Sequence, residues 1–186
     1  MLLKIFSVLR RNASYKKRLL TMNSWSRQVT ANVIVLAIMA LLPATLQAHH
    51  SFAMYDREVL YVFTGVVDSI NPDPSHLQIN FVPLNDERNA LVRDAAGERA
   101  TWSVEMESAA ASAREGISVS SFPRGTVFSV GLVPLRNGNL GGARRETLYR
   151  CPEGSAPEAG KHCDSVAGAI HYGEGELPSP TAVWAP

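Results

Sequence analysis

Apolar and polar positions alternate along the middle of the chain in the manner of β-strands. Residues 59–70, VLYVFTGVVDSI, are rich in β-branched and aromatic residues and end at the turn-forming NPDP. In residues 76–83, HLQINFVP, Leu77, Ile79 and Phe81 share one face, and polar residues share the other. These patterns predict a long first strand and a half-buried second strand.

The next segments predict one further strand and one short helix. Residues 84–99 are charged and end in a glycine turn, so we expect a solvent-exposed excursion there. ATWSVEM at 100–106 predicts a third strand. In ESAAASAREG, Ser108 is a candidate N-cap, and good helix formers lead from it to a candidate C-cap at Gly116.

Two more strands complete the pattern. GTVFSVGLVPL at 125–135 predicts the fourth strand, and RNGNLGG is a hairpin signal before a fifth strand, ARRETLYR at 143–150. The order of elements is therefore β-β-β-α-β-β. The predicted fold class is all-β with one short helix, a five-stranded OB-like Greek-key barrel.

The first 48 residues have the features of an export leader. The apolar run ANVIVLAIMALL at 31–42 follows Arg27 and precedes the small residue Ala48, which is typical of a secretory signal peptide cleaved after Ala48. The run is shorter than the roughly 20 residues that cross a bilayer, so we expect no stable membrane span after cleavage. Met22 is the preferred start of translation, and a genuine long leader is the alternative.

Charge is divided unevenly between this leader and the rest of the chain. Residues 1–48 contain seven Lys or Arg and no Asp or Glu, which leaves 11 basic and 17 acidic residues in the remainder, a net charge of −6. Nucleic-acid binding needs a concentrated basic surface, so nucleic acid is not an expected partner. We predict a periplasmic or secreted protein whose partner is an unidentified periplasmic protein or small ligand.

Cys151 and Cys163 are the two cysteines of the chain. In an oxidising compartment such a pair predicts a structural disulfide, and the lack of a CxxC motif disfavours zinc. The predicted organisation is a leader at 1–48, a barrel domain at 49–149, and a disulfide-pinned extension with a loose tail at 150–186. The tail prediction rests on a Pro-, Gly- and Ser-rich composition without periodicity.

Several of these segments together resemble a known family. They are AHHSFAMYD after the signal, TGVV in the first strand, NPDPSH, WSVEM, and RGTVFSVGLVPLRNGNLGG. In this combination the chain is similar to a family of small exported bacterial proteins that is catalogued only as a domain of unknown function. The resemblance covers about residues 49–149. It implies export and a small barrel, and it implies no particular activity.

The histidine pair beside the expected cleavage point predicts a copper site. Cleavage after Ala48 makes His49 the first residue, and its amine and Nδ1 can then chelate one metal ion together. A second imidazole would complete a T-shaped set of three nitrogens, a histidine brace, and such nitrogen-rich planar geometry favours copper. The candidate further ligands are His50, His76 and Glu105, of which the last two lie on polar faces of strands expected to be antiparallel neighbours. Exposed histidines without a metal are the alternative.

The leading prediction is therefore an exported, non-enzymatic binding protein with copper at its processed amino terminus. A metal-free binding module is the second hypothesis, with Gln78 and Trp102 as candidates for a ligand groove across the second and third strands. Burial in the core is the alternative for Trp102. An enzyme ranks lowest, because the chain has no phosphate loop, GxSxG or HExxH motif, and no catalytic residue is assigned. If the histidine brace exists, the enzyme that it would permit is a copper-dependent one.

Overall fold

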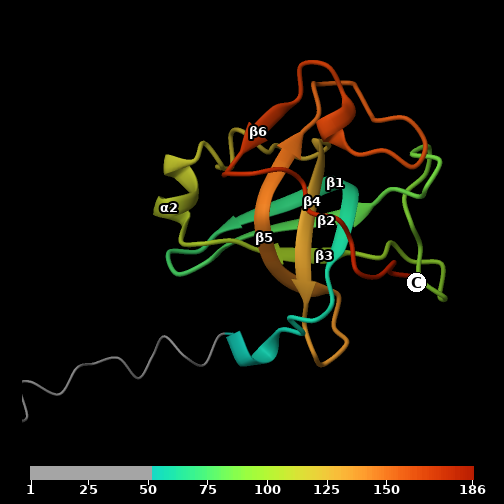
Figure 1. The fold of residues 1–186 in the computed structure, drawn as a ribbon, viewed down its shortest axis with the longest axis horizontal. Coiled ribbons are helices and arrows are strands. Elements are labelled where there is room, and N and C mark those ends of the chain that lie inside the picture. The colour runs from blue at the N-terminus through green and yellow to red at the C-terminus, as the bar shows by residue number, and fades with distance from the viewer. Residues whose placement is uncertain (1–51) are drawn as a thin grey trace, which may run out of the picture. The chain divides into compact units, whose positions relative to one another are not determined.

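A computed structural model describes residues 52–186 of the chain, and Figure 1 shows the fold. In chain order the elements are η2 (Phe52–Met54), β1 (Tyr61–Pro72), β2 (Leu77–Pro83), β3 (Trp102–Glu105), α2 (Ala109–Arg114), β4 (Val127–Pro134), β5 (Gly141–Arg150), η3 (Cys163–Ser165) and β6 (Ile170–Tyr172). The predicted leader, its cleavage point, His49 and His50 lie outside the described residues.

Five of the strands close into a barrel. β1 pairs antiparallel with β2 on one side and with β4 on the other, β2 pairs antiparallel with β3, and β4 pairs antiparallel with β5. The parallel pairing of β3 with β5 closes the ring, and β6 extends the sheet from β5. With the helix between β3 and β4, this is the OB-like arrangement, so the predicted fold class is confirmed.

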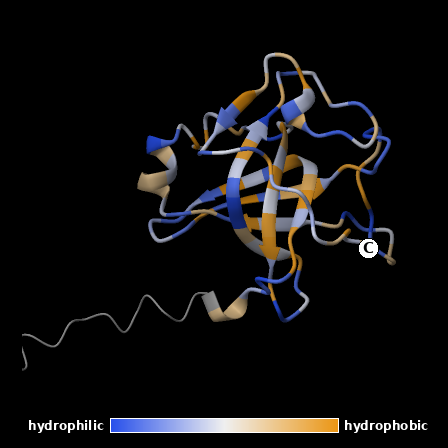
Figure 2. Cartoon of the chain, viewed as in Figure 1, coloured by the Kyte–Doolittle hydropathy of each residue, from blue (hydrophilic) through white to orange (hydrophobic). Residues whose placement is uncertain are grey.

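The period-two pattern of the sequence builds the core of the barrel. Leu77, Ile79 and Phe81 of β2 are buried, and so are Trp102 and Val104 of β3. Gln78 and Asn80 of β2, which alternate with them, are only partly buried, as strand geometry requires. In Figure 2 hydrophobic colour runs along much of the barrel wall, whereas the middle of β5 is hydrophilic. The polar side chains of β2 and β3 therefore lie outside the core, where they can take part in binding.

The short helix α2 forms where its capping residues predict it. The Ser108 side chain accepts a hydrogen bond from the Ala111 backbone N–H, and Glu115 is the C-cap. Gly116 follows with a φ of 89°, the left-handed conformation that glycine adopts without strain. The helix leads from the end of β3 towards β4 and places Glu115 near β5.

The extension after β5 is more ordered than its composition indicates. The predicted disulfide joins Cys151 to Cys163 and is consistent with an extracytoplasmic protein. β6 pairs antiparallel with β5, and Trp184 packs against the core where we expected a loose tail. That expectation failed because the ordering contacts come from barrel residues far away in the sequence, which local periodicity does not reveal. Within residues 52–186, no helix has the length and apolar character that a membrane crossing requires.

Candidate functional site

His76 and Glu105, expected on the polar faces of two neighbouring strands, lie side by side on the outside of the barrel. His76 immediately precedes β2, and Glu105 ends β3, the antiparallel neighbour of β2. His76 Nδ1 is 3.2 Å from Glu105 Oε1 and 3.3 Å from the Met106 carbonyl oxygen. Both neighbours are acceptors, so Nδ1 carries the proton in the neutral ring. Half of the His76 side chain is exposed, and its Nε2 makes no hydrogen bond within the described part of the chain.

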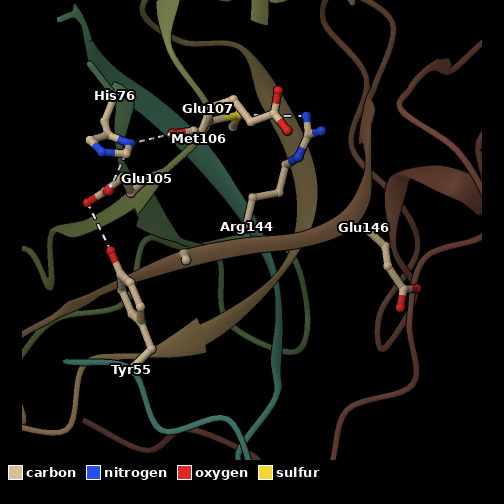
Figure 3. Close-up of a pocket in the computed structure, with 8 residues that line it drawn as sticks. Tyr55, His76, Glu105, Met106, Glu107, Arg144 and Glu146 are labelled. Atoms are coloured by element: carbon tan, nitrogen blue, oxygen red, sulfur yellow. Dashed lines mark hydrogen bonds and ion pairs between the residues drawn. The ribbon is translucent and has the colours of Figure 1, made fainter. Parts of the chain in front are cut away.

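Tyr55 connects the start of the described chain to this pair. It bridges to Leu135 and is almost fully buried, and its hydroxyl donates a hydrogen bond of 3.0 Å to Glu105 Oε2. Burial, then the hydrogen bond to Glu105 and its negative charge, raises the pKa of Tyr55 far above its usual range. The tyrosine therefore remains a neutral donor and holds the carboxylate in place. Figure 3 shows the resulting chain of Tyr55, Glu105 and His76.

The pair lines a hollow of about 400 Å³, and β5 also lines it through Ala143, Arg144 and Glu146. The Arg144 guanidinium donates to Glu115 Oε2 at 2.7 Å and to Met106 Sδ at 3.9 Å. Glu107 and Glu146 also line the hollow (Figure 3). Glu146 has a φ of 58° at the point where the β4–β5 register shifts, as in a β-bulge. These β5 residues could not be identified from the sequence, because barrel closure, rather than a motif, brings them to the hollow.

The two candidate groove residues have different surroundings. Gln78 is half-buried and lies opposite Glu105 in the β2–β3 register, beside the hollow. Trp102 is only 2% exposed and belongs to the core, so its use as an exposed platform was a wrong hypothesis and the core alternative is confirmed. The physical reason is strand alternation: Trp102 and Glu105 are separated by an odd number of positions and face opposite sides of β3.

The described residues do not by themselves complete a metal site. Within 52–186 no group of three or more His, Cys, Asp or Glu residues is placed to hold a metal ion. His76 and Glu105 supply two donors, and the other candidate ligands, His49 and His50, lie outside the described residues. A site with three such protein ligands at this hollow would therefore need a donor from outside the described residues.

Comparison with protein families identifies the chain. Residues 37–144 match the model of a family of unknown function, DUF6152. The chain belongs to this family. No curated protein and no solved structure matches the chain. The DUF6152 match includes Tyr55, His76 and Glu105, and it ends at Arg144 within β5.

A second polar cluster joins the extension, which lies beyond the DUF6152 match, to the barrel. His162 Nδ1 is 2.8 Å from Thr64 Oγ1, which is 2.8 Å from Ser129 Oγ, and Ser129 Oγ accepts from the Cys163 backbone N–H. Thr64 and Ser129 are buried. Burial and then the positive charge of Arg88 lower the pKa of His162, against a smaller opposing effect of Asp164. The cluster attaches the extension to β1 and β4 through a neutral histidine.

His162→Gln is expected to reduce the loss of stability that the protein shows on acidification. The unfolded chain takes up a proton near the ordinary histidine pKa of about 6.5, whereas the folded protein resists protonation because the pKa of His162 is lowered. The contribution of His162 to the free energy of unfolding is thus complete above about pH 6.5. It is lost as the pH falls towards the pKa of His162 in the folded protein. Urea unfolding at about pH 7.5 and at about pH 5 measures the difference.

The control for this prediction is His171→Gln, which changes an exposed histidine of β6. This variant should retain the wild-type dependence on pH. Equal pH dependence in the wild type and in His162→Gln would contradict the role given to His162.

Proposed function

We propose that the protein is an exported, non-enzymatic binding protein, periplasmic or secreted, that holds copper between its processed amino terminus and the hollow beside His76. The ligands would be the amine and imidazole of His49 and the Nε2 atom of His76. His50 is a further candidate donor. Glu105 would either bind the metal through oxygen or orient His76, and its contacts favour the orienting role.

The observation that carries this proposal is the hydrogen bonding of His76. Histidines that bind metals usually donate their other ring N–H to a carboxylate or carbonyl group, which fixes the ring and raises its basicity. His76 Nδ1 lies within hydrogen-bond reach of both the Glu105 carboxylate and the Met106 carbonyl oxygen. Nε2 is left with a free lone pair on an exposed side chain. Tyr55 in turn fixes Glu105.

The position of Tyr55 supports the involvement of the amino terminus. Tyr55 contacts Glu105 directly, so the chain passes beside the hollow six residues after His49. His49 lies three residues before Phe52, the first residue of η2, so its reach from that turn is at most about 10 Å. A set of imidazole and amine nitrogens would favour copper over the other common divalent ions.

Copper titration of the exported protein tests this proposal. Intact mass first establishes whether His49 is the amino-terminal residue. His49→Ala and His76→Ala are each expected to lower the affinity for Cu²⁺ by about 100-fold or more, because each removes a ligand, and Glu105→Gln by about 10-fold, because it weakens the orientation of His76. Competition with a chelator of known affinity gives the constants.

His171→Ala is the matched control, since it removes an exposed histidine that stacks on Tyr149 and does not line the hollow. Its copper affinity should equal that of the wild type. A mature terminus other than His49, or unchanged affinity in His49→Ala, would overturn the proposal.

A metal-free binding module is the second candidate, and one observation favours it. Both Glu105 oxygens have protein partners, His76 for Oε1 and Tyr55 for Oε2, so the described cluster is satisfied without a metal. In that case the hollow would receive a small ligand or a segment of a partner protein. A protein that binds no copper with His49 at its terminus would favour this function.

A further inference from the structure

The carboxyl-terminal tail crosses the barrel wall and ends over one part of its core. Pro178 lies so close to Gly131 of β4 that a Cβ atom at Gly131 would be 2.5 Å from Pro178 Cγ. Thr181 then pairs with Leu60, its backbone N–H donating to the Leu60 carbonyl at 3.0 Å and its Oγ1 accepting from the Leu60 N–H at 2.8 Å. Figure 1 shows the tail in front of β4, on its way to the terminus marked C.

Beyond Thr181 the tail places one aromatic ring on the core. The centre of the Trp184 indole lies 5.3 Å from the centre of the Trp102 indole and 5.9 Å from that of the Phe63 ring. Both contacts are edge-to-face. Tyr61 contacts Trp102 from another side. No regular secondary structure holds residues 173–186, so the attachment rests on the Thr181 hydrogen bonds, on the Pro178 contact and on this ring.

Trp102, which packs against Trp184, has a buried donor without a partner in the described part of the chain. The Nε1 atom of Trp102 is buried, and among the described residues it is the one buried side-chain nitrogen or oxygen without a hydrogen-bond partner. A buried donor without a partner costs free energy. The indole of Trp184 has a donor and no acceptor, so it fills space beside Trp102 but offers no conventional hydrogen bond. An aromatic ring with an acceptor atom would fill the same space and also accept a hydrogen bond from Trp102 Nε1.

We propose that the part of the barrel covered by Trp184 is a binding site for a planar aromatic compound that bears a hydrogen-bond acceptor, and that the tail is its displaceable cover. The ligand takes the place of the Trp184 indole against Trp102 and Phe63 and accepts a hydrogen bond from Trp102 Nε1. This site lies on the inner side of β3, whereas Glu105 faces outward, so it is independent of the proposed copper site.

Three bicyclic compounds of similar size test the proposal: quinoline has a ring-nitrogen acceptor, indole a donor only, and naphthalene neither. In Trp184→Ala, quinoline is expected to bind at one site about 10-fold or more tightly than the other two, and more tightly than it binds the wild type. The indole N–H resonance of Trp102, identified by its loss in Trp102→Phe, should shift on quinoline binding. In Trp102→Phe/Trp184→Ala, the preference for quinoline should disappear.

Trp184→Leu serves as a second variant, because it keeps an apolar side chain over the core and protects folding. Equal binding of all three compounds to a folded variant would overturn the acceptor specificity. Absence of saturable quinoline binding in the folded variants would overturn the site itself. If neither variant folds, the wild type decides the question at higher concentrations: a Trp102 resonance that does not shift with quinoline overturns the proposal.

Discussion

Replacing Gly142 with alanine is expected to lower the free energy of unfolding by about 3 kcal/mol, because overpacking at this position meets backbone that cannot move aside. A Cβ atom at Gly142 would collide with the Val133 carbonyl oxygen and lie 2.6 Å from Leu132 Cδ1. Gly142 pairs with Val104 of β3 in the parallel contact that closes the barrel. The loss should appear in urea unfolding followed by circular dichroism.

The adjacent Gly141→Ala is the matched control for this effect. Its Cβ atom would approach the end of the Leu135 side chain at 3.1 Å and the Ser103 carbonyl oxygen at 3.5 Å. A flexible side chain can move by a few tenths of an ångström, so we expect a loss below about 1 kcal/mol. Equal stability losses at the two glycines would show that the rigid Val133 backbone is not the cause of the larger loss.

Phe128→Ala is expected to destabilise the protein more than Gly142→Ala does, and to lower the free energy of unfolding by about 4 kcal/mol. Phe128 of β4 is fully buried, and its ring lies 5.2 Å from that of Phe81 and 5.9 Å from that of Phe122. Truncation removes these edge-to-face contacts and leaves a cavity that the surrounding strands cannot fill. The measurement is again the free energy of unfolding in urea.

Phe128→Leu is the control, because it shows whether the loss in Phe128→Ala comes from the cavity or from any substitution at this position. Leucine retains most of the apolar volume, so the expected loss is below about 1.5 kcal/mol. If Phe128→Ala cost as little as Phe128→Leu, the barrel core would not be packed around this ring as described.

Much of the fold could be predicted from local patterns. The alternation of Leu77, Ile79 and Phe81 specified both the strand and its buried face, because strand side chains alternate strictly. Ser108 specified the start of α2 through its hydrogen bond to a free backbone N–H. The strand β6 was not predicted, because three residues give no period and its pairing with β5 is a long-range contact.

The candidate site could be predicted only in part. The polar positions of His76 and Glu105 on two antiparallel neighbouring strands were predicted, and the contact between the two side chains came from the structure. Tyr55 and Arg144 were missed as polar partners of the site, since they reach it from segments far from both strands. The cluster around His162 was missed for the same reason.

By itself, the sequence determined the order of the strands, the faces that they bury, the capped helix and the cysteine pair, because each depends on residues a few positions apart or on residue type alone. The tertiary structure decided which distant groups meet. Barrel closure brought β5 against β3 and so formed the hollow beside His76 and Glu105. It also buried Trp102 beneath Trp184, since the tail gains its order only from contact with the closed barrel.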